Sequence, residues 1–250
     1  MKLLLSNDDG VNADGIWALH DALAPIAEIV VVAPEREQSA SSHALTLHTP
    51  LRIRKLRERV YAVDGTPTDC VLLAVRGLGG EIDFEPDFVI SGINHGPNLG
   101  DDVTYSGTVA AAFEGHLLGI PSIAFSDFNA GGDHLDAARA ARILLEQLAT
   151  GDVPSDLLLN VNFPALPFDD LKGFRVAGLG KRRYEDVIEE RVDPRGRTYY
   201  WLGGSPTWDE DPASDMAALS AGYISVTPMH LALTDDKKLT PMKEWNLKLR

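Results

Sequence analysis

Residues 3–34 read LLLSNDDGVNADGIWALHDALAPIAEIVVVAP and predict the class of fold. Two short apolar runs, residues 3–5 and 29–33, are typical of buried strands. Between them, apolar residues at helical spacing predict a helix from about Asp14 to Leu23, which Pro25 ends. A strand, a helix and a strand in this order imply parallel pairing with a right-handed crossover.

The same alternation continues along the chain and predicts an α/β fold with a mainly parallel sheet. Further strands are expected at residues 60–63, 87–90, 122–126, 157–163 and 223–227, and further helices from Thr66, at 106–118, at 134–149 after a cap at Asp133, and at 239–249. Residues 182–200 alternate polar and apolar side chains around the turn sequence DPRG at 193–196. They predict a long β-hairpin arm with few apolar partners of its own, for which a neighbouring subunit is a reasonable partner.

Composition excludes several classes of protein. The 250 residues suffice for one large α/β domain or two small ones, and 23 basic against 37 acidic residues give a net charge of −14. Such a chain is poorly suited to bind a nucleic-acid duplex, which needs clustered Lys and Arg. No apolar run is long enough to span a membrane or to form a signal peptide, and the single cysteine, Cys70, cannot form an intrachain disulfide. These features predict a cytoplasmic protein.

Polar residues follow three of the predicted strands. Asp8 and Asp9 come after the first strand, the loop 35–42 after the second, and residues 91–94 (SGIN) after the strand at 87–90. The carboxyl ends of parallel strands meet at one edge of an open sheet, and ligands bind there. We therefore expect the three loops to converge.

The oxygen atoms of these loops suit one hard divalent cation, Mg²⁺ or Mn²⁺. Two carboxylates about 4 Å apart repel by roughly 4 kcal/mol at an effective dielectric constant near 20, and a cation removes that repulsion. Asp8, Asp9, the Ser39 hydroxyl and the Asn94 amide oxygen form the predicted ligand set. The alternative is that residues 7–10 (NDDG) form only a turn.

A second site element opens the helix at 106–118. Ser106, Gly107 and Thr108 combine free backbone N–H groups, two hydroxyls and the positive end of the helix dipole, which together can bind a phosphate. The alternative is an ordinary serine N-cap. The preceding pair Asp101 and Asp102 is read as a loop-orienting feature, with a second metal site as the alternative.

Competing catalytic motifs lack the right context. Cys70 and Arg76 have the spacing of cysteine phosphatases, but the five residues between them are apolar and continue a helix, so Cys70 is interpreted as a small buried residue. The chain has no HExxH motif, P-loop or G-x-S-x-G elbow. His43 and His95 lie near the predicted edge and are interpreted as supporting or solvent-facing residues, with contact to the substrate as the alternative.

Several longer motifs resemble those of the SurE family, the stationary-phase survival protein E, a group of metal-dependent 5′(3′)-nucleotidases. They are LLSNDDG at 4–10, VAP at 32–34 with QS at 38–39, GTPTDC at 65–70, SGIN at 91–94, GPNLGDD at 96–102, YSGTVAA at 105–111, DPRG at 193–196 and TP at 227–228. Their order and spacing run through most of the chain. Each tetrapeptide alone is weak, but together they are highly specific.

The resemblance implies a Rossmann-like three-layer core at residues 1–170. It also implies that residues 171–250 supply the last core strand, a β-hairpin arm and a C-terminal helix, within one structural domain overall. The arm and helix are expected to join subunits into a homodimer or homotetramer. The family's metal ligands map onto the four residues named above, and its phosphate-binding residues onto Ser106, Gly107 and Thr108 with Asn98 nearby. Residues 40–43 (ASSH) leave base and sugar preference open.

The sequence therefore predicts a phosphomonoesterase that acts on nucleoside 5′- and 3′-monophosphates. Asp9 is the predicted residue that orients or deprotonates the attacking water, and a covalent phosphate on Asp8 is the alternative mechanism. Two other functions remain open: hydrolysis of polyphosphate or sugar phosphates at the same site, and nucleotide sensing without catalysis.

Overall fold

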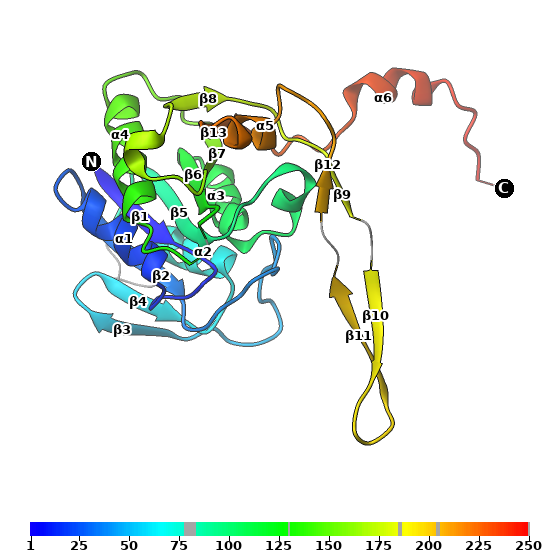
Figure 1. Ribbon diagram of the computed structural model, residues 1–250, viewed down its shortest axis with the longest axis horizontal. Helices are drawn as coiled ribbons and strands as arrows, with labels where there is room; N and C mark the ends of the chain where they lie inside the picture. The colour runs from blue at the N-terminus through cyan, green and yellow to red at the C-terminus, as the bar shows by residue number, and fades with distance from the viewer. Residues whose placement is uncertain (78–83, 130, 185–186, 204–205, 250) are drawn as a thin grey trace.

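A nine-stranded sheet forms the centre of the protein (Figure 1). The computed structural model describes residues 1–77, 84–129, 131–184, 187–203 and 206–249. The strands follow the order β3-β4-β2-β1-β5-β6-β7-β13-β8 across the sheet. All neighbouring pairs are parallel except β3 with β4 and β13 with β7, so the sheet is mainly parallel, as predicted.

The sheet strands lie close to the predicted positions. Their bounds are β1 (Lys2–Ser6), β2 (Glu28–Pro34), β3 (Ile53–Arg57), β4 (Val60–Val63), β5 (Phe88–His95), β6 (Ser122–Asp127), β7 (Leu158–Phe163), β8 (Phe174–Val176) and β13 (Ile224–Pro228). The sequence analysis missed β3 and β8, which occupy the two edges of the sheet. The β3 strand is largely exposed and charged, so it carries little of the apolar signal that marks a buried strand.

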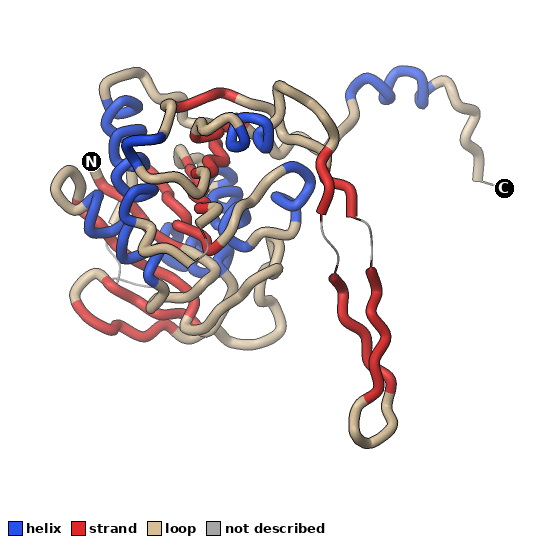
Figure 2. Tube along the Cα trace, in the orientation of Figure 1, coloured by secondary structure: helices blue, strands red, loops and turns tan. Residues whose placement is uncertain are grey.

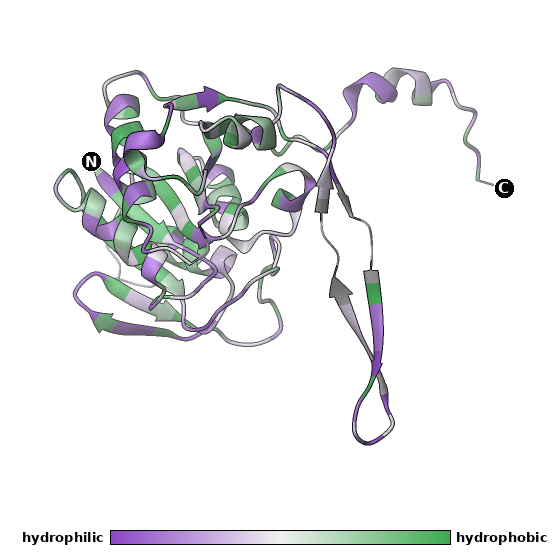
Figure 3. Ribbon diagram, viewed as in Figure 1, coloured by the Kyte–Doolittle hydropathy of each residue, from purple (hydrophilic) through white to green (hydrophobic). Residues whose placement is uncertain are grey.

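Helices cover both faces of the sheet and complete three layers (Figure 2). They are α1 (Asp14–Leu23), α2 (Pro67–Arg76), α3 (Gly107–Leu117), α4 (Leu135–Ala149) and α5 (Asp215–Ser220), with short 3-10 turns at Gly100–Thr104 and Phe168–Asp170. The last helix, α6 (Asp236–Lys243), lies apart from the sheet (Figure 1) and buries no residue. Side chains alternate along β1, so Leu3 and Leu5 join the core under α1 and α4, whereas Leu4 joins the core under α2 and α3. Hydrophobic colour is concentrated in these central strands (Figure 3).

The order of strands explains why polar loops gather at one edge. The chain passes from β1 to β2 and β4 on one side and then returns to β5 on the other side of β1. The β1–β5 boundary is therefore a topological switch point, where an open α/β sheet leaves a crevice at the carboxyl ends of its strands. Asp8 and Asn94 come from these two neighbouring strand ends.

The N-terminus of α2 has the predicted capping box. The Thr66 hydroxyl accepts the Asp69 N–H, and Asp69 Oδ2 accepts the Thr66 N–H (2.9 Å). The predicted cap of α4 is wrong by one residue, because His134 occupies the N-cap position with φ of 58°. Asp133 instead accepts the Leu135 N–H through Oδ1 (3.2 Å).

An arm projects from the body (Figure 1) and is longer than predicted. It consists of β10 (Val187–Val192) paired with β11 (Thr198–Gly203) and, at its base, β9 (Arg182–Tyr184) paired with β12 (Pro206–Trp208). The turn lies at the predicted DPRG sequence, where the Gly196 N–H donates to the Asp193 carbonyl (2.9 Å). The predicted C-terminal helix at 239–249 is displaced toward the N-terminus: α6 ends at Lys243, with Pro241 inside it. No helix among the described residues is long and apolar enough to span a bilayer.

Candidate active site at the carboxyl edge of the sheet

The loop after β1 is held by its own buried asparagine. Asn7 donates through Nδ2 to the Gly10 carbonyl (2.9 Å), and its Oδ1 accepts the Gly10 N–H (3.2 Å). Asn7 is fully buried, so these bonds fix the turn rigidly. The next two residues differ in exposure, because the Asp8 carboxylate is buried and Asp9 is half-buried.

Thr108 links two of the predicted metal ligands. Its hydroxyl donates to Asp8 Oδ1 and lies 3.3 Å from Asn94 Oδ1. The Asn94 amide nitrogen donates to the Gly96 carbonyl (2.7 Å), which turns its oxygen toward Thr108 and Asp8. The side-chain oxygen of Asn94 and the carboxylate of Asp8 therefore both lie next to one hydroxyl.

Gly107 packs directly against Asp8. A Cβ at Gly107 would lie 2.7 Å from Asp8 Cβ, a distance that real side chains do not tolerate. The glycine therefore lets the first turn of α3 reach the carboxylate. This contact brings the predicted phosphate-binding and metal-binding elements together.

The loop that carries Ser39 is attached to the site by the preceding residue, Gln38. The Gln38 N–H donates to the Asp8 carbonyl (2.7 Å), which ties the loop after β2 to the loop after β1. Ser39 itself is exposed, and its hydroxyl donates to Glu37 Oε1 (2.7 Å). The hydroxyl donates its proton to Glu37, so its lone pairs remain available to a cation.

The carboxylates of the site are strained electrostatically. Burial raises the pKa of Asp8 from 3.8 to about 6, and the neighbouring charge of Asp9 adds to the increase, whereas the hydrogen bond from Thr108 opposes it. Burial also raises the pKa of Asp9, against the lowering effect of His95. A buried acidic pair of this kind is stabilised by a nearby positive charge.

The donor set fits a hard cation. It contains two carboxylates, one amide oxygen and one hydroxyl, and Mg²⁺ and Mn²⁺ prefer such oxygen ligands and keep several waters. Within the part of the chain that the structure describes, no three His, Cys, Asp or Glu residues cluster as a metal site. Nitrogen- and sulfur-rich zinc chemistry is thus not supported by the described residues.

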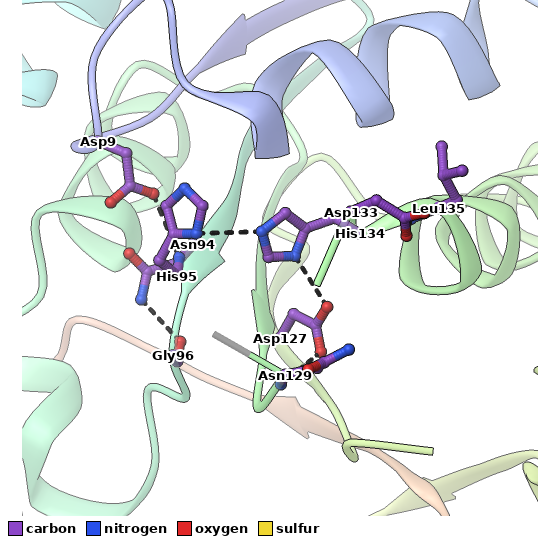
Figure 4. Close-up of polar contacts among 9 residues, drawn as sticks. All are labelled: Asp9, Asn94, His95, Gly96, Asp127, Asn129, Asp133, His134 and Leu135. Carbon is purple, nitrogen blue, oxygen red and sulfur yellow. Dashed lines mark hydrogen bonds and ion pairs between the residues drawn. The ribbon is translucent and has the colours of Figure 1, made fainter. Parts of the chain in front are cut away.

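The buried side chains of His134 and Asp127 are hydrogen-bonded to each other and support the edge of the site (Figure 4). Asp9 Oδ2 accepts the backbone N–H of His95 (3.2 Å), and His95 Nδ1 lies 3.1 Å from His134 Nε2. His134 Nδ1 in turn bonds Asp127 Oδ2 (2.8 Å). The sequence analysis placed His95 near the edge but missed His134 and Asp127. Asp127 directly follows a predicted strand, which is the signal that could have identified it.

Asn98 is fixed by amides of β7. Its carbonyl accepts bonds from Asn160 Nδ2 (2.8 Å) and Asn162 Nδ2 (3.0 Å), and its N–H donates to Asn162 Oδ1 (2.8 Å). Its side chain donates to Ser126 Oγ (2.8 Å). The two β7 asparagines were missed, although amides at alternate positions of an otherwise apolar strand are an unusual pattern that points to a polar task.

The hydroxyls of the predicted phosphate cradle already have partners within the chain. Ser106 Oγ accepts the Val109 N–H (3.1 Å), so Ser106 acts as the N-cap of α3. The Thr108 hydroxyl donates to Asp8 Oδ1. The backbone N–H groups at the start of α3 and the dipole of the helix remain the main features that favour an anion there.

Hydrogen bonds hold the loop from Glu35 to residue 51 against the body at three points. The Ser42 N–H donates to the Tyr105 carbonyl (3.1 Å), and His43 Nε2 lies 2.9 Å from the buried Glu114 Oε2 of α3. Thr46 donates to Asp69 through both its N–H and its hydroxyl. His43 therefore anchors this loop to α3.

Two other sequence interpretations concern residues outside this cluster. Cys70 is buried within α2, where burial raises the pKa of its thiol, and this supports a structural residue rather than a nucleophile. Asp102 forms an ion pair with Arg182 at the base of the arm, which favours the loop-orienting role over a second metal site.

Comparison with known proteins identifies the family. The sequence model described as "Survival protein SurE" matches residues 3–186. The chain belongs to the SurE family. Proteins named "5′-nucleotidase SurE" from Geotalea uraniireducens and Vibrio cholerae are each 50% identical to it, over 99% of this chain and 100% of the first relative, and over 98% of this chain and 97% of the second.

The fold also agrees with that of a solved SurE structure. The crystal structure of the SurE protein from Aquifex aeolicus is 42% identical and aligns with a TM-score of 0.85, over 97% of this chain and 98% of that chain. The Rossmann-like three-layer fold expected from the SurE resemblance is therefore confirmed.

Proposed function

We infer that this protein is a phosphomonoesterase with 5′-nucleotidase activity, which hydrolyses nucleoside 5′- and 3′-monophosphates to nucleoside and phosphate. The observation that carries the mechanism is the contact between Gly107 and Asp8, because it joins an anion-binding helix start to a buried carboxylate. A phosphate bound at the start of α3 lies within reach of an ion held by Asp8. The full-length relatives named 5′-nucleotidases support the reaction class.

One divalent ion is proposed, held by Asp8, Asp9, Ser39 and Asn94, with Mg²⁺ or Mn²⁺ as the metal. When bound, it supplies charge neutralisation at the phosphoryl group and lowers the pKa of a bound water. Hydrolysis of phosphate monoesters is among the slowest uncatalysed reactions, so this neutralisation has to be large. Ser39 would contribute an oxygen lone pair while its proton is donated to Glu37.

The residues of the chain divide the remaining tasks. The N–H groups at Gly107 and Thr108, with Ser106 and Asn98, bind and orient the phosphate. Asp9, held by the His95 N–H, orients the water that attacks phosphorus and accepts its proton. The bond from phosphorus to the nucleoside oxygen breaks, and that oxygen takes up a proton to leave as the hydroxyl.

A covalent phosphate on Asp8 is the competing mechanism, and isotope labelling together with chemical trapping separates the two. In water enriched in heavy oxygen, direct attack puts the label into released phosphate, and so does an aspartyl phosphate that water attacks at phosphorus. An aspartyl phosphate that water attacks at the carboxyl carbon puts the label into Asp8, so label in the peptide containing Asp8 excludes direct attack. Trapping with hydroxylamine during turnover tests the remaining route, because hydroxylamine reacts with an aspartyl phosphate and leaves a modified Asp8 that mass spectrometry detects.

The arm and the C-terminal segment are proposed to join subunits into a dimer or tetramer. Large apolar side chains are exposed along both: Ile188, Val192, Tyr199, Tyr200 and Trp201 on the arm, and Leu239, Met242, Trp245, Leu247 and Leu249 in the C-terminal segment. Exposed apolar side chains gathered in this way are typical of interaction surfaces. A cytoplasmic location is part of the proposal, supported by the single, buried and unpaired cysteine.

A substrate panel tests the proposed activity. Phosphate release is measured from nucleoside 5′- and 3′-monophosphates, tripolyphosphate and a sugar phosphate, with Mg²⁺ or Mn²⁺ and again with a chelator. The expected result is metal-dependent release from the nucleoside monophosphates. Tight nucleotide binding without release would instead identify a sensor, and preference for tripolyphosphate or the sugar phosphate would replace the proposed substrate class.

A further inference from the structure

Ser41 has a buried hydroxyl without a hydrogen-bond partner. Its Oγ is shielded from solvent, and none of the residues that the structure describes bonds to it. A buried hydroxyl without a partner is unfavourable, so each such group calls for an explanation, and a bound ligand is one.

The backbone on both sides of Ser41 is fixed. The Ser41 N–H donates to the Gln38 carbonyl (3.2 Å), and the next N–H, that of Ser42, donates to the Tyr105 carbonyl (3.1 Å). Gln38 is the residue that also contacts the backbone of Asp8. The position of the Ser41 side chain is therefore set by the same contacts that assemble the site.

The free hydroxyl lies at the junction of the metal and phosphate elements. The position of a Cβ on Gly107 is 2.8 Å from Ser41 Oγ and 2.9 Å from Asp8 Oδ2. Ser41 Oγ and Asp8 Oδ2 are thus both next to the first residue of α3. A phosphate bound at the start of α3 would lie close to this hydroxyl as well as to the backbone N–H groups.

We propose that Ser41 is a further substrate-binding residue, whose hydroxyl donates a hydrogen bond to a non-bridging oxygen of the substrate phosphate. The inference rests on the proposed function and extends it to a residue of the loop after Ser39. A phosphate oxygen supplies the acceptor that the chain does not, and a hydrogen bond to a charged group is stronger than one between neutral groups. The cradle then includes a side-chain donor in addition to Ser106, whose Oγ accepts the Val109 N–H, whereas the Thr108 hydroxyl donates to Asp8.

The test compares Ser41→Ala with Ser41→Thr, which keeps the hydroxyl. The control is Thr68→Val, because Thr68 in α2 also carries a buried hydroxyl without a partner. KM and kcat are measured with a nucleoside 5′-monophosphate, and inorganic phosphate binding is measured both by inhibition and by the rise in melting temperature of the Mg²⁺-loaded protein. Binding of Mn²⁺ alone is titrated in parallel.

The expected effect of Ser41→Ala is a loss of phosphate affinity and an increase in KM of about tenfold or more, with Mn²⁺ affinity unchanged. Without phosphate the variant should be at least as stable as the original protein, because alanine removes an unsatisfied group. Ser41→Thr should restore binding, and Thr68→Val should leave it unchanged.

Three results would overturn the assignment. They are unchanged phosphate binding in Ser41→Ala, a loss of stability in that variant without phosphate, and a loss of Mn²⁺ affinity with phosphate binding intact. The last would make Ser41 a metal-site residue. Binding of inorganic phosphate tests Ser41 even if no nucleotide is hydrolysed, so failure of the proposed activity and failure of this inference are separate outcomes.

Discussion

Replacing Asp8 by asparagine is expected to stabilise the metal-free protein while it abolishes turnover. The carboxylate is buried with Asp9 beside it, and its pKa rises from 3.8 to about 6 on folding. Each pKa unit corresponds to about 1.4 kcal/mol, so the ionised carboxylate destabilises the folded state by about 3 kcal/mol at neutral pH. Asparagine keeps an oxygen that can accept the Thr108 hydroxyl but carries no charge.

The pH dependence gives the sign of the effect. Below the unfolded pKa both states are protonated, and Asp8 has no electrostatic effect on stability. As pH rises from about 4 to about 6, the unfolded carboxyl ionises first and the penalty grows; above the folded pKa it is complete. The difference between variant and original protein is therefore about 1.5 kcal/mol near pH 5 and about 3 kcal/mol near pH 7.5.

Thermal and urea denaturation with a chelator measure this difference. For a chain of this size, about 3 kcal/mol corresponds to an increase in melting temperature of about 6 °C or more. Asp152→Asn, which neutralises an exposed carboxylate, is the matched control and should change little. Addition of Mn²⁺ should stabilise the original protein and not the Asp8 variant. Equal stability of the two proteins at pH 7.5, or a difference that does not shrink at pH 5, would refute the reasoning.

Three further predictions concern the site, its support and the arm. Thr108→Val removes the hydroxyl that links Asp8 and Asn94, so the affinity for Mn²⁺ in calorimetric titration should fall about tenfold. Thr108→Ser should keep the affinity. Equal affinities of Thr108→Val and the original protein would contradict the linking role. His134→Phe removes the partner of Asp127 Oδ2 and leaves the buried carboxylate, among the described residues, only the Asn129 N–H at Oδ1. The free energy of unfolding in urea should fall by about 2 kcal/mol, and no loss would show that the pair is dispensable. Trp201→Glu places a charge on the exposed apolar surface of the arm and should shift the protein to monomers in light scattering; an original protein that is already monomeric would exclude the proposed interface.

The sequence predicted those parts of the fold that depend on local patterns. The parallel core followed from β-branched runs that alternate with helices, and the α2 cap followed from Thr66 and Asp69 three residues apart. The edge strand β3 was not predicted, because its exposed residues have no apolar periodicity. The α6 boundary was missed because that helix has no buried residue, so no apolar stripe marks its length.

For the site, the sequence indicated which loops converge but not which side chains hydrogen-bond to one another. Strand order places Asp8 beside Asn94, and this much follows from βαβ connectivity. That the Thr108 hydroxyl bonds Asp8 rather than remaining free depends on the close approach at Gly107, which only tertiary packing determines. The pair of His134 and Asp127 forms across the start of α4, where His134 adopts a left-handed backbone that no spacing rule anticipates.

The base of the arm has one further consequence. Arg182 and Trp208 pair across the root, and the Asp209 N–H donates to the Lys181 carbonyl (3.1 Å), so the two ends of the excursion lie next to each other. The chain then continues into α5 and β13, and β13 takes its place in the sheet between β7 and β8. The projection is thus an excursion between two adjacent points of the body, and the part beyond β9 and β12 can change in length without altering the path of the sheet. Its root belongs to the body, because Arg182 pairs with Asp102 in the turn that precedes α3. A shorter or exchanged arm that keeps this root therefore keeps the ion pair beside the site.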